Sequence, residues 1–165
     1  MTGGTVAATS IYLRTVTVLD EVNWIFKKGL ANMNHSRDAH GLTSWRDRHL
    51  IVVGSWHHKD SSRTCEIYDI KRNKWFDLPL LHDATSAPGL VIIKDRYLYK
   101  IGGQTDIDVI EVLDLHKISM STGNRKRPFS EVISCASGSS LGSSVEYHGL
   151  PKLQKKHKSQ PTATA

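Results

Sequence analysis

The sequence predicts an all-β protein that repeats one small antiparallel sheet. Short runs of β-branched and aromatic residues alternate with polar residues, which is the period of two expected of strands. Gly, Asn and Asp separate these runs, and such residues are typical of tight turns. The pattern also recurs: Gly54 and Gly102 each end an apolar run, and they lie 48 residues apart.

The charge of the chain is concentrated near its C-terminal end. Residues 1–115 carry 14 basic and 14 acidic side chains, whereas residues 116–165 carry eight basic and two acidic ones. The overall charge of +6 therefore does not indicate that the folded part binds nucleic acid, and we expect such contacts only through the basic segment.

Two further patterns bear on membrane association and on the cellular compartment of the chain. No apolar run approaches the roughly 20 residues that a membrane helix needs, so we expect no membrane partner. Cys65 and Cys135 lie far apart and form no CxxC metal pattern, which agrees with a reducing compartment. We expect a cytoplasmic protein, with the nucleus as the alternative through the basic segment.

The first expected unit is partial and covers residues 10–30. Residues 1–9 are small and polar, and we expect them to be disordered. Residues 11–20 form a β-branched run with strand propensity, and Asp20 and Asn23 supply turn chemistry. Residues 24–26 return as a second strand, which predicts a hairpin.

The second expected unit is complete and covers residues 39–81. Its strands are predicted at residues 40–45, 49–54, 64–69 and 74–79, joined by two tight turns and one longer polar loop. Four short strands in succession predict a meander.

The third expected unit is again partial and covers residues 89–115. Three strands are predicted, at residues 89–93, 97–103 and 109–114, but no fourth strand follows them. Residues 116–165 are rich in Ser and Lys, so we expect a disordered basic tail.

The spacing of single residues indicates that these units are repeats. Asp20, Asp69 and Asp114 are separated by 49 and 45 residues, and Trp24 and Trp75 by 51. A period in this range, with one sheet per repeat, is typical of a β-propeller array. A unit of this size cannot bury both faces of its sheet alone, so neighbouring units must stack.

Over residues 10–115 the repeats resemble kelch repeats. A diglycine after the second strand matches Ile101-Gly102-Gly103, and Val53-Gly54-Ser55 matches it with one glycine replaced. The later motifs match Tyr68-Asp69 with Asn73-Lys74-Trp75, and also Leu19-Asp20 with Asn23-Trp24. The resemblance implies four-stranded propeller blades.

The number of repeats falls short of a closed ring. A propeller usually needs four to eight blades, and this chain offers about two to three. Three interpretations follow: a fragment of a longer kelch protein, a chain that associates with further copies to complete a propeller, or a degraded family member. We favour the fragment.

Most of the motif residues have a structural role in this interpretation. Trp24 and Trp75 are expected to fill the gaps between adjacent blades. Asp69 and Asp114 are expected to accept hydrogen bonds from the turns that follow them. The remaining structural positions of the repeat are Gly54, Gly102, Gly103 and Tyr68.

Function in such a scaffold is expected in the loops. The resemblance implies that a partner peptide meets the loops at residues 55–63 and 104–108 and the linkers at residues 33–39 and 80–88. Aromatic and arginine side chains carry most interface energy, and histidines accompany them here. The candidate partner contacts are Arg37, Trp56, His57, His58, Arg63 and His82. We expect a non-catalytic protein-binding module, as part of a substrate adaptor or scaffold.

The competing interpretation is an enzyme related to the kelch-like copper oxidases. Tyr68, Cys65 and several histidines supply the residue types of such a site, but the repeat itself explains Tyr68 and Cys65. His57 and His58 are adjacent and lack evenly spaced further ligands, so we expect no metal and no other cofactor. No recognisable catalytic arrangement is present in the sequence, and we expect no enzymatic activity.

Overall fold

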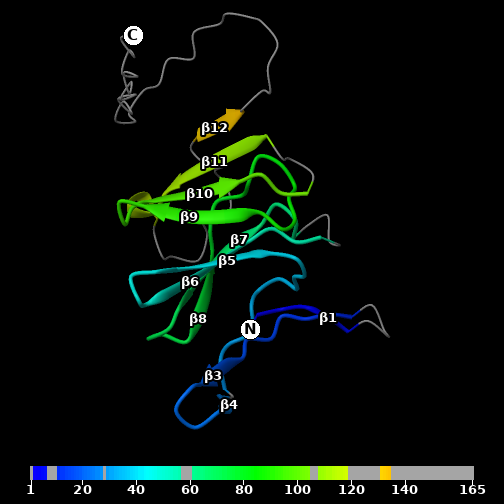
Figure 1. Cartoon of the computed structure of the whole chain (residues 1–165), viewed down its shortest axis with the longest axis vertical. Coiled ribbons are helices and arrows are strands. Elements are labelled where there is room, and N and C mark those ends of the chain that lie inside the picture. The colour runs from blue at the N-terminus through cyan, green and yellow to red at the C-terminus, as the bar shows by residue number, and fades with distance from the viewer. Residues whose placement is uncertain are drawn as a thin grey trace, which may run out of the picture.

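A computed structural model describes residues 2–6, 11–27, 29–56, 61–104, 108–118 and 131–134. Within these ranges every regular element is a β-strand except one 3₁₀ turn, Leu115–Lys117 (Figure 1). The described part of the chain contains no helix that is long and apolar enough to cross a membrane. The prediction of an all-β protein is confirmed.

The central sheet is the complete four-stranded meander that the sequence predicts. Its strands lie in the order β5-β6-β7-β8, and each pairs antiparallel with the next. The turn after the first strand places Arg46 and Asp47 at φ values of 53° and 45°, as tight hairpins require. The bounds are β5 (Gly41–Trp45), β6 (His49–Val53), β7 (Cys65–Asp69) and β8 (Lys74–Asp77).

The next sheet has one strand more than the sequence predicts. Three of its strands match the expected ones: β9 (Gly89–Ile93), β10 (Tyr97–Ile101) and β11 (Val109–Asp114). The fourth, β12 (Glu131–Ser134), pairs antiparallel with β11 and completes the order β12-β11-β10-β9. The expectation of disorder therefore does not hold for these four residues, because the edge of β11 offers backbone partners to a short β-branched run. The rest of the expected tail beyond Ile118 lies outside the described residues.

Two short hairpins form the N-terminal part. The expected strand at residues 11–20 is divided between β2 (Ile11–Tyr12) and β3 (Val18–Asp20). Strand β3 pairs with β4 (Ile25–Lys27), as predicted, whereas β2 pairs with β1 (Thr5–Val6). Part of the segment expected to be disordered is therefore a strand, and residues 7–10 lie outside the described residues.

Gly3 and Gly4 occupy the diglycine position of the first unit, an echo that the sequence interpretation missed. Thr2 forms an antiparallel bridge with Val16, which repeats the last rung between β6 and β7. In all three units a glycine N–H donates to a backbone carbonyl oxygen near the start of the third strand. These hydrogen bonds join Gly3 to Thr15 (2.9 Å), Gly54 to Thr64 (3.1 Å) and Gly102 to Val109 (2.9 Å).

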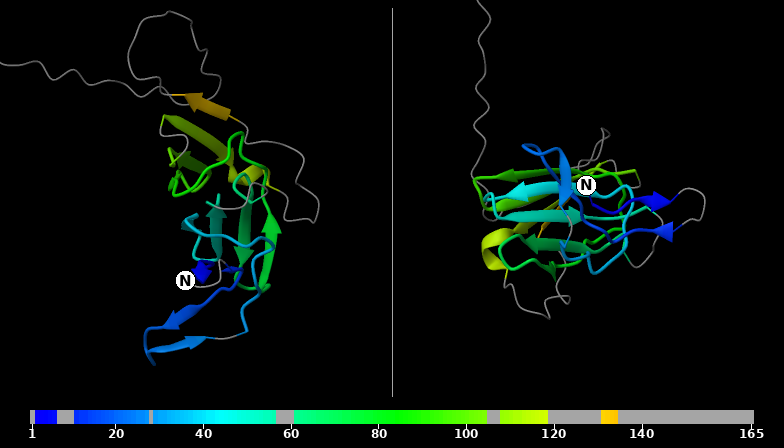
Figure 2. Two further views of the ribbon diagram at one scale, coloured as in Figure 1. Left: turned by 90° about the vertical axis from the view of Figure 1, so that its right-hand side faces the viewer. Right: turned by 90° about the horizontal axis from the view of Figure 1, so that it is seen from below.

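The sheets stack through two apolar clusters and follow one another along a curved path, without closing into a ring in the described residues (Figure 2). The larger cluster lies between the central sheet and the β9–β12 sheet, and the smaller one lies toward the N-terminal hairpins. The larger cluster includes Trp45, Ile51, Ile67, Leu98 and Leu113. The smaller cluster consists of Val16, Met33, Val52, Tyr68 and Trp75.

The two tryptophans of the repeat motif differ in burial. Trp75 is 4% exposed in the smaller cluster, and its indole N–H donates to Ala31 O at 2.9 Å. Trp24, expected to be buried in the same way, is 76% exposed. That expectation is wrong because Trp24 follows Asp20 by four residues, whereas Trp75 follows Asp69 by six. The shorter connection leaves Trp24 in the turn itself, at a φ of 52°.

Candidate functional site

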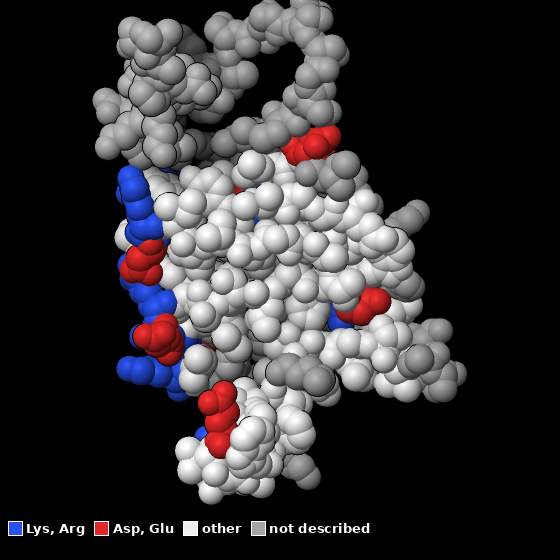
Figure 3. Space-filling model, viewed as in Figure 1, with Lys and Arg blue, Asp and Glu red and all other residues white. Residues whose placement is uncertain are grey.

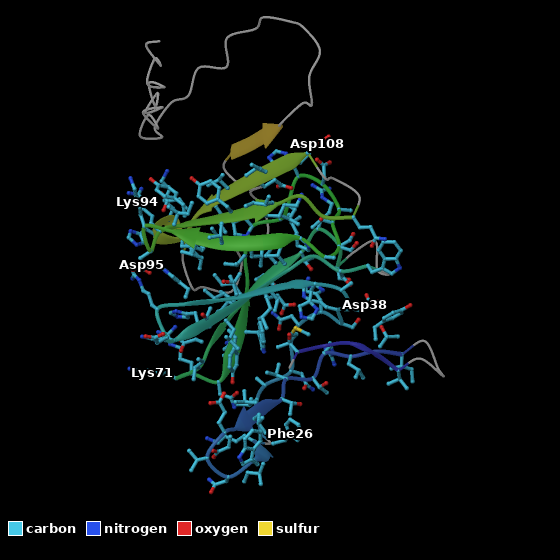
Figure 4. All side chains as sticks on the ribbon, in the orientation of Figure 1. Phe26, Asp38, Lys71, Lys94, Asp95 and Asp108 are labelled. Carbon is cyan, nitrogen blue, oxygen red and sulfur yellow. The ribbon has the colours of Figure 1, made fainter. Side chains whose placement is uncertain are left out.

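The loops and linkers named from the sequence meet at one edge of the stacked sheets. Thr85 joins two of them, because its N–H donates to Ser62 O and its carbonyl accepts from Ser55 N–H, both at 3.0 Å. Gln104 N–H donates to Ser86 O at 2.9 Å and adds the third. We call the surface formed by residues 33–39, 55–56, 61–63, 80–88 and 102–104 the loop face. Asp38 and Asp108 mark its edge in Figure 4, and Lys71 and Lys94 mark the opposite one.

Arg37 is buried beneath the loop face and binds the backbone of its loops. Its side chain is 0% exposed, so the expectation that it contacts a partner is corrected. Its Nη1 donates to the carbonyl oxygens of Gly54 (2.9 Å), Ser61 (3.2 Å) and Thr64 (2.8 Å). A buried cation needs such partners, and here they are the backbone of the loop that follows β6.

Glu66 on β7 balances this charge. Its Oε1 accepts from Arg37 Nη2 at 2.8 Å, and both side chains are fully buried. The same carboxylate accepts the backbone N–H groups of Asn34 (2.6 Å) and His35 (3.1 Å). One ion pair thus fixes a linker, a loop and a strand relative to one another.

Three of the remaining candidate contacts lie on the surface. Trp56 is 45% exposed, and its backbone N–H donates to Asp38 O at 3.1 Å. Arg63 is exposed, and its Nε donates to Leu81 O at 3.0 Å. His82 is exposed, and its backbone N–H donates to a carboxylate oxygen of Glu111 at 2.8 Å. His57 and His58 lie outside the described residues.

The aspartates of the repeat close the opposite ends of the strands. Asp69 accepts the backbone N–H groups of Lys71 (3.0 Å) and Arg72 (3.2 Å), as expected. Arg48 also binds its two oxygens at 2.8 and 3.3 Å. These hydrogen bonds, with that of Arg48 first, lower the pKa of Asp69 to about 2.

The other structural positions follow the same logic. Asp114 binds Arg96 through both oxygens and also accepts from His116 N–H, and these hydrogen bonds lower its pKa. The Tyr68 ring packs on Trp75 with centroids 5.0 Å apart, and its hydroxyl donates to Asn73 Oδ1 at 2.6 Å. Gly54, Gly102 and Gly103 have φ values of 77°, 54° and 138°.

Cys65 and Tyr68, which were considered for a copper site, do not come together. Cys65 belongs to the larger apolar cluster and Tyr68 to the smaller one, so the two side chains lie on opposite sides of the central sheet. Burial raises the pKa of the Cys65 thiol to about 12, which keeps it protonated. Within the ranges that the structure describes, no three His, Cys, Asp or Glu side chains are grouped as metal ligands would be.

A second group of side chains has no counterpart among the sequence candidates. The group comes from two turns, Arg46-Asp47-Arg48 and Lys94-Asp95-Arg96, each of which follows the first strand of a four-stranded sheet. The structure brings them together, with Arg46 Nε 2.6 Å from Asp95 Oδ2. Their sequence signal is the recurrence of a basic-Asp-Arg triplet at the repeat spacing.

The comparisons with known proteins do not place the chain. No protein-family model matches the sequence, and no curated protein matches it either.

Proposed function

We propose that the chain is an incomplete kelch-type array of propeller blades that binds a protein partner through its loop face. Three units with equivalent glycine hydrogen bonds and stacked antiparallel sheets support the repeat interpretation. In this proposal the array is non-catalytic, works in the cytoplasm and belongs to a longer adaptor or scaffold.

The observation that carries this proposal is the exposed Trp56 on a loop that a buried arginine holds in place. An indole supplies a large contact area, and Trp and Arg are the side chains most often found at interface hot spots. Arg63 and His82 share the surface, and Leu81 connects them, since it binds Arg63 and precedes His82.

The internal support of the loop face favours binding. A flexible loop loses conformational entropy when it meets a partner, and this loss opposes association. Here the hydrogen bonds of Arg37 fix the backbone on both sides of the loop, at Gly54 and at residues 61–64. The described part of the loop is therefore prepared for a partner before contact.

A peptide selection tests the proposal. Peptides enriched from a random display library on the immobilised chain would be synthesised and their affinities measured by fluorescence anisotropy. Trp56→Ala and Arg63→Ala are expected to weaken the selected peptides by tenfold or more, because each removes an exposed anchor. Lys94→Ala, on the opposite edge, is the matched control and should leave the affinity unchanged.

The loop-face proposal would be abandoned if the selected peptides bound the Trp56 and Arg63 variants as tightly as the unchanged chain. Peptides that Lys94→Ala weakens instead would place the binding surface on the opposite edge.

Self-association is a second candidate, favoured by exposed apolar side chains at both ends of the stack. Ile25 and Phe26 on β4 are 58% and 61% exposed, and Val91 and Ile93 on β9 are also exposed. Two such ends on one chain fit a head-to-tail contact between copies. Light scattering should then show mass that grows with concentration, and Phe26→Asp should reduce that growth.

A further inference from the structure

A charged hollow lies at the edge opposite the loop face. Its volume is about 550 Å³, and it lies where the turns after β5 and β7 meet the 3₁₀ turn. We call this edge the turn face. Figure 3 shows basic and acidic side chains alternating along it, and Figure 4 labels Lys71, Lys94 and Asp95 there.

Three arginines line the hollow. Arg46, Arg48 and Arg72 keep 47%, 41% and 58% of their side-chain surface exposed. Asp69 is the carboxylate in the lining. It binds Arg48 and two backbone N–H groups, and its Oδ2 also lies 3.7 Å from Arg72 Nε.

The charge balance of this edge favours an anion. Counting Asp95, whose carboxylate binds Arg46, three guanidinium groups of the hollow face two carboxylates. The whole turn face, with these residues included, has seven basic side chains and four carboxylates. These are Arg46, Arg48, Lys71, Arg72, Lys94, Arg96 and Lys117 against Asp47, Asp69, Asp95 and Asp114.

The remaining lining is apolar and aromatic. Trp45 and Leu115 are buried at the boundary of the larger cluster, and Ile118 packs against the same cluster. Arg46 lies over the Trp45 ring at 4.7 Å, with its Nη2 2.8 Å from His116 Nε2. The stacked guanidinium is therefore held in place over an apolar floor.

His49 adds a buried polar group to this lining. It is 8% exposed, its ring packs on Trp45, and its Nδ1 has no hydrogen-bond partner in the described part of the chain. Buried polar atoms are usually satisfied, so an atom without a partner calls for an explanation such as a bound water, an ion or a ligand contact. The hollow thus combines arginine side chains, apolar lining residues and a ring nitrogen of His49 that has no hydrogen-bond partner in the described part of the chain.

We propose that this hollow binds an acidic peptide in which a glutamate or aspartate is next to a large apolar side chain. The guanidinium groups of Arg46 and Arg72 receive the carboxylates, because the planar fork of Arg matches them. The apolar side chain packs against Ile118, since Trp45 and Leu115 are only 7% and 2% exposed. A nucleic acid backbone would use the charges but not the apolar surface of Ile118. The site is separate from the loop face and does not depend on the function proposed for it.

The proposal is tested with a fluorescein-labelled peptide, Ser-Glu-Glu-Leu-Glu-Gly, titrated with the full chain at low ionic strength. Anisotropy should report saturable binding, and the analogue with every Glu replaced by Gln should bind at least about tenfold more weakly, as expected for losing charge-assisted hydrogen bonds. Arg72→Gln and Arg46→Gln are each expected to weaken the acidic peptide several-fold.

Lys71→Gln is the matched control, since it removes the same charge one residue away from Arg72 and outside the lining. It should weaken the acidic peptide clearly less than Arg72→Gln does, because Lys71 adds only long-range charge. Far-ultraviolet circular dichroism would confirm that each variant folds, and the two arginine variants serve as independent tests.

Three outcomes overturn the proposal: no saturable binding of the acidic peptide, equal weakening by Lys71→Gln and Arg72→Gln, or equal binding of the Gln analogue. Tighter binding of a labelled single-stranded DNA oligonucleotide than of the peptide would also overturn it, in favour of nucleic acid.

Discussion

Arg37 and Glu66 form an ion pair with no exposed surface, 2.8 Å between Nη2 and Oε1, although Arg37 belongs to a linker and Glu66 to β7. The next unit keeps the glutamate as Glu111 but takes its cation from elsewhere. Thr85 stands at the linker position of Arg37, and Lys100 on β10 lies 3.7 Å from Glu111 Oε1. The repeat thus retains a buried charge pair while changing the strand or linker that supplies it.

Arg37→Leu should lower the free energy of unfolding by about 3–5 kcal/mol, because it leaves Glu66 buried without its cation. Urea denaturation followed by tryptophan fluorescence measures this change. Arg37→Leu combined with Glu66→Leu should recover part of the loss, since the uncompensated charge is then removed.

The matched control is Arg46→Leu, which breaks the exposed pair with Asp95 and should change stability by about 1 kcal/mol or less. Equal losses in Arg37→Leu and Arg46→Leu would contradict the structural role assigned to the buried pair.

Trp75→Ala and Trp24→Ala should differ in their loss of stability, although both tryptophans belong to the same repeat motif. Trp75 fills the smaller apolar cluster, so its truncation should cost about 3–5 kcal/mol. Trp24 is exposed in a turn, and its truncation should stay within about 0.5 kcal/mol. Both values come from urea denaturation, and a loss of similar size in both variants would show that Trp24 is buried in solution.

The strands of the two larger sheets were predictable because their signals are local. Alternating apolar residues and turn residues such as Asn73 act within a few positions, and the predicted runs coincide with β5 to β11. Gly3 and Gly4 carried a usable signal too, since Gly3 precedes Gly54 by 51 residues, but no apolar run before them identified a strand.

The contacts between units could not be predicted in the same way. An arginine in a polar linker is expected at the surface, and its burial depends on Glu66, 29 residues away. The turn-face hollow likewise requires residues near positions 46, 72 and 116 to meet, which no local pattern reports. β12 pairs with the edge of β11, a partner that its own four residues do not reveal.

Gly54→Ala should destabilise the chain more than Gly29→Ala. Both glycines have left-handed backbones, with φ values of 77° and 86°. A Cβ on Gly54 would lie 2.5 Å from Thr85 O, whereas a Cβ on Gly29 would meet nothing within 4 Å. Gly29→Ala should therefore cost about 1 kcal/mol from strain alone, and Gly54→Ala clearly more. Thermal or urea unfolding of the two variants measures this difference. Equal losses of stability would refute the close approach of the linker to Gly54.

His40 should make stability depend on pH in the weakly acidic range. Burial, followed by the nearby charge of Arg37, lowers the pKa of His40 from 6.5 to about 4. Between these values the unfolded chain binds more protons than the folded one, so stability falls as the pH is lowered from about 6.5 to about 4. The difference corresponds to roughly 2–3 kcal/mol.

Urea midpoints measured across this range test the role of His40. His40→Gln keeps a polar side chain of similar size but removes the titration, so its stability should change less over the same interval. His82→Gln, at an exposed histidine, should retain the full dependence of the unchanged chain. Asp69 contributes in a separate window: its pKa is lowered to about 2, so its stabilisation is lost only as the pH falls from its ordinary pKa of 3.8 toward that value. Parallel curves for His40→Gln and the unchanged chain would show that the imidazole is not buried as described.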